Sequence, residues 1–168
     1  MVVRLLHSAL FALGLSACVV PGDARADPVV PGEEHCVVNV RADDVLNMRA
    51  RPDPGAGVVA RKRTGECGIV ATGACQASWC PVEDGHSRGW VHSRYVGMVS
   101  PAIYCVTGAA PGDVLNLRAY PSPRSRVIAR LDRHRCGIAF LPYAVGGWQK
   151  IRIEGRQGWV DRRYVSGQ

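Results

Sequence analysis

The hydrophobic and polar positions along the chain alternate in short runs, with turn residues between them. In residues 148–153 (Trp-Gln-Lys-Ile-Arg-Ile), polar and apolar side chains alternate from Lys150 to Ile153, which is typical of a half-buried β-strand. The pattern predicts further strands in this half of the chain at 104–107, 115–119, 127–131, 137–141 and 158–160. Turn formers such as Pro111-Gly112 and Gly146-Gly147 separate these runs. Strands this short and this closely spaced predict a small β-barrel.

An internal repeat organises the chain after residue 35. A shift of 69 residues, the separation of Cys36 and Cys105, also places Cys67 on Cys136 without a gap. The same shift aligns 44–50 with 113–119, 89–91 with 158–160, and 94–96 with 163–165. A register of this length predicts a duplicated domain of about sixty residues. The copies are placed at 36–97 and 105–166, with linkers at 27–35 and 98–104.

Each copy resembles the bacterial SH3 (SH3b) family. The motifs are Leu-Asn-Met-Arg at 46–49 followed by Pro52, and Leu-Asn-Leu-Arg at 115–118 followed by Pro121. Both copies also end in the family's Gly-Trp-Val and Arg-Tyr-Val sequences. The resemblance implies an all-β protein of two tandem small SH3-like β-barrels that acts as a non-catalytic binding module of the bacterial cell envelope. The Asp-Arg-His-Arg turn at 132–135 and the cysteines depart from the family pattern.

Six cysteines follow residue 35, and an even number in a small exported chain predicts disulfides that staple each barrel. Because equivalent positions of a repeat should form equivalent bonds, we expect the pairs Cys36–Cys67, Cys105–Cys136 and Cys75–Cys80. Four residues separate Cys75 from Cys80, which is not the close Cys-x2-Cys spacing of zinc sites or thioredoxin-like redox sites. We therefore expect no metal site and no cofactor.

The N-terminus has the pattern of an export signal. Arg4 precedes an apolar run from residue 5 to 15 that is broken only by His7, Ser8 and Gly14 and is too short to span a membrane. Two processing sites compete. Leu-Ser-Ala-Cys at 15–18 resembles a lipoprotein signal that would lipidate Cys18 after removal of 1–17, whereas Ala-Arg-Ala at 24–26 would release a chain that starts at Asp27. Both predict an exported, periplasmic protein, and the first adds a lipid anchor, its only contact with a membrane, in the outer membrane.

Catalysis is not expected, because the chain lacks the nucleophile, phosphate-binding and metalloprotease motifs of known enzyme classes. Trp79 and Trp148 flank a loop and are the candidate ligand-binding aromatics, whereas Trp90 and Trp159 are expected in the core. Asn47 and Asn116, with Arg49 and Arg118, are expected to fix the adjoining strand and turn rather than to contact a ligand.

Basic residues gather in the second copy. Residues 105–168 carry 11 basic and 4 acidic side chains, against 8 and 6 in residues 36–104. Arginine suits carboxylate and phosphate ligands, so a cell-wall or other anionic envelope component is the expected partner; an ordinary solvated surface is the alternative. The candidate anion contacts are Arg124, Arg126, Arg133 and Arg135.

Nucleic acid is not an expected partner of an exported protein. Two alternatives to wall binding remain open at this point. One is an adaptor whose barrels bind peptides of a periplasmic partner protein. The other is a disulfide-rich secreted inhibitor or effector.

Overall fold

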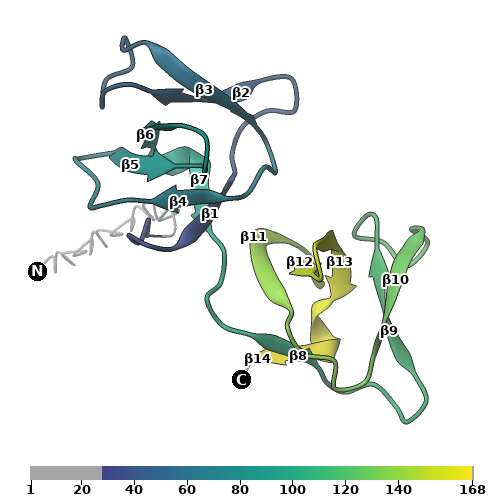
Figure 1. The fold of residues 1–168 in the computed structure, drawn as a ribbon. Helices are drawn as coiled ribbons and strands as arrows, with labels where there is room; N and C mark the ends of the chain where they lie inside the picture. The colour runs from purple at the N-terminus through teal and green to yellow at the C-terminus, as the bar shows by residue number, and fades with distance from the viewer. Residues whose placement is uncertain (1–27, 168) are drawn as a thin grey trace, which may run out of the picture.

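The computed structural model describes residues 28–167, which form two β-barrels joined by a short segment (Figure 1). The predicted export signal 1–26, Cys18 and Asp27 lie outside the described residues. Barrel one consists of β1 (Glu34–Val37), β2 (Val45–Arg49), β3 (Val58–Arg63), β4 (Ile69–Ala71), β5 (Trp79–Glu83), β6 (Arg88–His92), the 3-10 turn η1 (Ser93–Tyr95) and β7 (Val96–Met98). Barrel two consists of β8 (Tyr104–Val106), β9 (Val114–Arg118), β10 (Val127–Asp132), β11 (Ala139–Val145), β12 (Trp148–Ile153), β13 (Arg156–Asp161), the 3-10 turn η2 (Arg162–Tyr164) and β14 (Val165–Gly167).

The two barrels share one topology. Barrel one is an antiparallel sheet in the order β3-β2-β6-β5-β4-β1-β7, and barrel two repeats it as β10-β9-β13-β12-β11 with β14-β8 beside it. In barrel two, a single β-bridge between Tyr104 and Ile138 joins the pair β14-β8 to the other five strands. This confirms the predicted all-β fold of two tandem SH3-like barrels. The final strands, β7 and β14, were not predicted; after each 3-10 turn they pair with the first strand of their own barrel.

Alternating side chains build a separate core in each barrel. In β2 the inward side chains are Leu46 and Met48, and β12 alternates in the same way along its whole length. The core cluster of barrel one contains Val37, Leu46, Met48, Ile69, Val82, Val91 and Val96. The larger cluster of barrel two contains Val106, Leu115, Leu117, Leu131, Ile138, Phe140, Ile151, Ile153, Val160 and Val165.

The three predicted disulfides are confirmed. The S–S distances are 2.05 Å for Cys36–Cys67, 2.03 Å for Cys75–Cys80 and 1.99 Å for Cys105–Cys136. The first and third join the first strand of a barrel to the segment before its fourth strand. Closing a loop with a separation of 31 residues stabilises a barrel by about 4 kcal/mol in the chain-entropy model.

The structure corrects the expectation that Trp90 and Trp159 lie in the core. Both are only half-buried, because their neighbours Val91 and Val160 take the inward positions of β6 and β13. Trp90 lies opposite Arg49, and Trp159 lies opposite Arg118. Within residues 28–167, no helix is long and apolar enough to cross a membrane.

Candidate binding clefts

Each barrel has an open cleft, and the two clefts occupy equivalent positions of the repeat. Cleft one has a volume of about 410 Å³ and cleft two about 490 Å³. Cleft one is lined by Asn39, Val40, Arg41, Asp44, Val45, Leu46, Asn47, Arg49, Pro54, Trp79, His92 and Tyr95. Every residue that lines cleft two lies 69 positions further along the chain. Eight of the twelve pairs are the same residue type, including the tryptophan, the tyrosine, the proline and the asparagine.

Trp79 and Trp148, the aromatics singled out from the sequence, both line the clefts. Each is the first residue of the strand that leaves a tight hairpin, so the hairpin turn positions its indole. Both side chains are half-buried, which leaves part of the ring accessible to a ligand. Sequence reasoning did not identify Tyr95 and Tyr164 as cleft residues; the repeated Arg-Tyr-Val motif marks both.

An arginine and an asparagine lie beside each cleft at equivalent positions of the repeat. Arg49 donates a hydrogen bond of 2.7 Å to the carbonyl oxygen of Ala56, and Arg118 makes the same bond to Ser125. Both bonds fix the loop beside the cleft, as expected from the sequence. Asn47 and Asn116 line the clefts, as Arg49 and Arg118 also do. All four are therefore candidate ligand contacts, although the sequence analysis assigned them a structural role only.

The clefts differ at the residue that caps the 3-10 turn. In cleft one the His92 Nδ1 accepts the backbone N–H of Arg94, and the imidazole lies edge-on to Trp79 at 5.6 Å. Its centroid is 5.8 Å from that of Tyr95, so three aromatic rings lie in succession. In cleft two Asp161 caps the turn and pairs with the Arg163 guanidinium, whose hydrogen bonds lower the pKa of the Asp161 carboxyl.

The remaining differences are at the β1–β2 loop. Cleft one has Asn39, Val40 and Arg41 where cleft two has glycine and two alanines. The rim of cleft one therefore has larger side chains and an additional basic group, although barrel two as a whole carries the larger positive charge.

The four candidate anion-binding arginines do not line cleft two. Arg124, Arg126 and Arg133 are exposed in loops of barrel two, and Arg135 forms an ion pair with Glu154. Anion binding by these arginines stays a prediction, and the structure separates it from the cleft. Within residues 28–167, no group of three or more His, Cys, Asp or Glu side chains is placed to hold a metal ion.

Comparison with known proteins covers the first barrel. Residues 42–96 match the bacterial SH3 domain family. The match confirms the resemblance for barrel one, whereas for barrel two the resemblance rests on the repeat and the shared topology. No curated protein matches the chain.

Two solved structures share a limited likeness with the chain. NlpC2 from Trichomonas vaginalis is 10% identical with a TM-score of 0.39, over 81% of this chain and 48% of that chain. NlpC1 from the same organism is 11% identical with a TM-score of 0.38, over 85% of this chain and 49% of that chain. The chain thus spans about half the length of each.

Proposed function

We propose that this protein is a non-catalytic binding module of the bacterial cell envelope and that clefts one and two are its ligand sites. The observation that carries the proposal is the pair of open clefts with the same tryptophan, tyrosine, proline and asparagine at equivalent positions. Binding sites combine apolar and aromatic walls with a few polar groups that orient the ligand, and both clefts have this character. The proposed ligand is peptidoglycan or another anionic envelope component.

The envelope assignment includes the proposal that the protein is exported. The N-terminal signal pattern and the three disulfides favour an oxidising compartment such as the periplasm. Mass spectrometry of the native protein tests this proposal, because it distinguishes a lipidated Cys18 from a start at Asp27. A full-length product that retains residue 1 would contradict export.

The test of the cleft assignment is retention on purified peptidoglycan sacculi. Trp79→Ala and Trp148→Ala should each weaken retention, and the double variant should lose it. Trp90→Ala and Trp159→Ala are matched controls, because these tryptophans are also half-buried but lie outside both clefts. Circular dichroism establishes that each variant is folded. Equal retention of the double cleft variant and the wild type would refute the cleft assignment.

A peptide-binding adaptor is the second candidate, favoured by the tryptophan, tyrosine and proline in each cleft. Aromatic-lined grooves of this kind bind extended proline-rich peptides. Sacculi stripped of protein discriminate between the two functions, since an adaptor would not be retained on them.

A further inference from the structure

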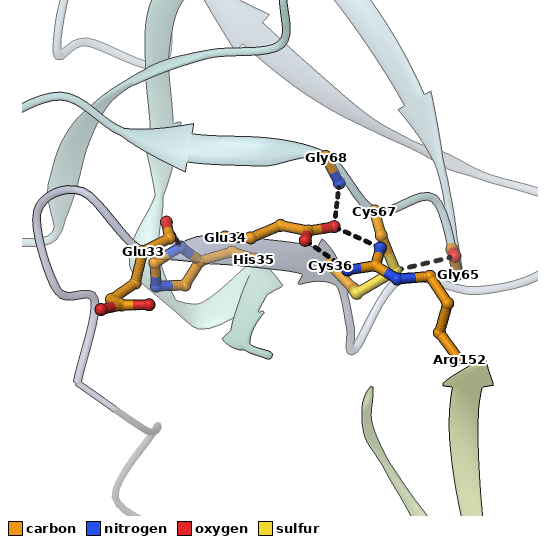
Figure 2. A network of polar contacts seen from close by, with 8 residues as sticks. All are labelled: Glu33, Glu34, His35, Cys36, Gly65, Cys67, Gly68 and Arg152. Carbon is orange, nitrogen blue, oxygen red and sulfur yellow. Dashed lines mark hydrogen bonds and ion pairs between the residues drawn. A yellow bond between two sulfur atoms is a disulfide. The ribbon is translucent and has the colours of Figure 1, made fainter. Parts of the chain in front are cut away.

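The two barrels contact each other through a bidentate ion pair. Arg152 of β12 donates to both carboxylate oxygens of Glu34 in β1, at 2.7 and 2.6 Å (Figure 2). The backbone N–H of Gly68 donates to the same carboxylate at 3.0 Å. The hydrogen bond from Arg152 lowers the pKa of Glu34. A two-pronged contact of this kind fixes orientation as well as distance.

Apolar packing accompanies this ion pair. Cys36, Val99 and Leu141 form a buried cluster between the barrels, and the Cys36–Cys67 disulfide is part of it. The Tyr143 hydroxyl donates to the carbonyl oxygen of Val37, and burial raises the pKa of this phenol to about 12. The barrels are therefore docked as well as linked.

Further contacts join the linker and β7 to barrel two. The linker residue Ser100 donates its backbone N–H to Phe140 at 3.0 Å. A Cβ atom on Gly97 would lie only 2.9 Å from the Pro142 side chain, so glycine lets the backbone of β7 approach that side chain closely.

Several of the docking residues lie at positions where the two copies differ. Where barrel two has Leu141, Tyr143 and Arg152, the equivalent residues of barrel one are threonine, alanine and glutamate. Glu34 corresponds to Ile103, which is 58% exposed. The cleft positions, by contrast, are mostly the same in both copies, and no docking residue lines either cleft. Docking therefore leaves both clefts open and holds them in one fixed relation.

We propose that the docked barrels bind one polymer at two places, with clefts one and two holding successive copies of the same repeating unit. The polymer class is a cell-wall strand of repeating sugar–peptide units, and this inference rests on the proposed function. Once one cleft is occupied, the second faces a tethered ligand at an effective concentration that can reach the millimolar range. Avidity of this kind can exceed the affinity of a single site by about 10²- to 10⁴-fold, provided that the spacing of the sites fits the ligand.

The test separates docking from cleft binding. A triple variant, Leu141→Thr, Tyr143→Ala and Arg152→Glu, gives barrel two the residues that barrel one has at the equivalent positions of the repeat, so the barrel itself should fold. Spin labels on the two barrels should report a broadened distance distribution in this variant. Exchange of charges in Glu34→Arg with Arg152→Glu is the matched control, because it keeps an ion pair at the contact.

Two probes are compared: soluble muropeptides that carry a single repeating unit, and intact sacculi. We expect the triple variant to bind the muropeptide as the wild type does but to lose at least tenfold in retention on sacculi. The charge-exchange variant should retain most of the wild-type binding. Undiminished retention on sacculi by a triple variant with broadened distances would overturn bivalent binding. A second result would also overturn bivalent binding. If Trp79→Ala or Trp148→Ala abolishes muropeptide binding at its own cleft, and that variant is nevertheless retained on sacculi as strongly as the wild type, a single cleft is enough for retention.

Failure of the proposed function has a different signature. In that case neither the muropeptide nor the sacculi would distinguish the wild type from the double tryptophan variant. Muropeptide binding that depends on the clefts, without any gain on sacculi, would leave the proposed function standing and refute bivalency alone.

Discussion

The hairpin that carries Trp79 contains an unfavourable backbone conformation held by a disulfide. Gln76 and Trp79 exchange two backbone hydrogen bonds, of 2.7 and 3.0 Å, and Ala77 in the turn has a φ of 51°. A left-handed conformation costs a residue with a Cβ atom about 1–2 kcal/mol. The Cys75–Cys80 disulfide closes this turn over a separation of five residues. In the chain-entropy model a loop of this size contributes about 2 kcal/mol of stability.

Barrel two forms the equivalent hairpin without a disulfide. Gly146 lies where barrel one has Ala77, and its φ is 56°. Gln149 lies where barrel one has Cys80, and its side-chain nitrogen is within hydrogen-bond distance of three backbone carbonyl oxygens. The disulfide of barrel one thus has the same bracing role as the glycine and the buried amide of barrel two.

Ala77→Gly should therefore stabilise the protein. Glycine removes the strain of the left-handed conformation, but it loses more backbone entropy than alanine on folding. The net gain in the free energy of unfolding is about 0.5–1 kcal/mol. Removal of the disulfide in Cys75→Ala with Cys80→Ala should cost about 2 kcal/mol. Guanidinium unfolding followed by circular dichroism measures both changes. Hydrogen exchange of residues 72–82 locates them.

The matched control is Gly146→Ala. No atom lies within 4 Å of a Cβ built on Gly146, so this substitution tests backbone conformation alone. We expect it to destabilise barrel two by about 1 kcal/mol, the reverse of Ala77→Gly. A neutral Gly146→Ala, or an Ala77→Gly that lowers the unfolding midpoint, would refute the strain argument.

Four further predictions follow from single features of the barrels. Lys62 lowers the pKa of Asp84 to about 2, so this ion pair should add about 1 kcal/mol to the free energy of unfolding above pH 4. The contribution is lost as the pH falls towards 2. Acid unfolding of Lys62→Met should therefore show a smaller pH dependence between about pH 4 and 2. A Cβ on Gly158 would lie 2.8 Å from a β9 carbonyl oxygen, so Gly158→Ala should cost about 1–3 kcal/mol in denaturant unfolding. If barrel two binds anions through its loops, Arg133→Ala with Arg135→Ala should reduce retention on anionic liposomes at 0.1 M salt and change nothing at about 1 M, where charges are screened beyond about 3 Å. Graded reduction should unfold barrel one before barrel two, as peptide-level hydrogen exchange can resolve.

The repeat explains why so much of the fold was predictable. Equivalent cysteines indicated two of the disulfides and left Cys75 and Cys80 to form the third. The pattern in 148–153 located β12 to the residue. The same register, applied to Trp79 and Trp148, located one wall of each cleft. What these features share is that they depend on short-range pattern or on the correspondence between copies.

Features that depend on long-range contact could not be predicted in this way. Glu34 and Arg152 are 118 positions apart. Their equivalents in the other copy are Ile103 and Glu83, which cannot form the same ion pair, so the repeat gives no indication of this contact. The count of arginines in barrel two gave no information about where they lie, because Arg135 is paired with Glu154 and the others are dispersed in loops. Trp90 and Trp159 were misplaced because a tryptophan beside a valine in a strand does not reveal which of the two faces inward.

The two copies have reached stable barrels by different means. Barrel two buries Leu131, Ile153 and Phe140 at three positions where barrel one has Lys62, Asp84 and an alanine, and this difference accounts for its larger core cluster.

Each large apolar side chain of this kind contributes about 1.5–3 kcal/mol when fully buried. A lysine–aspartate ion pair contributes less, because both charges lose hydration. Barrel one therefore starts with the weaker core, and it is the copy with the second disulfide. A barrel of about sixty residues is only marginally stable, because it buries little surface on folding. The extra cysteine pair thus lies in the copy whose apolar core is smaller, and barrel one depends more on an oxidising compartment than barrel two does.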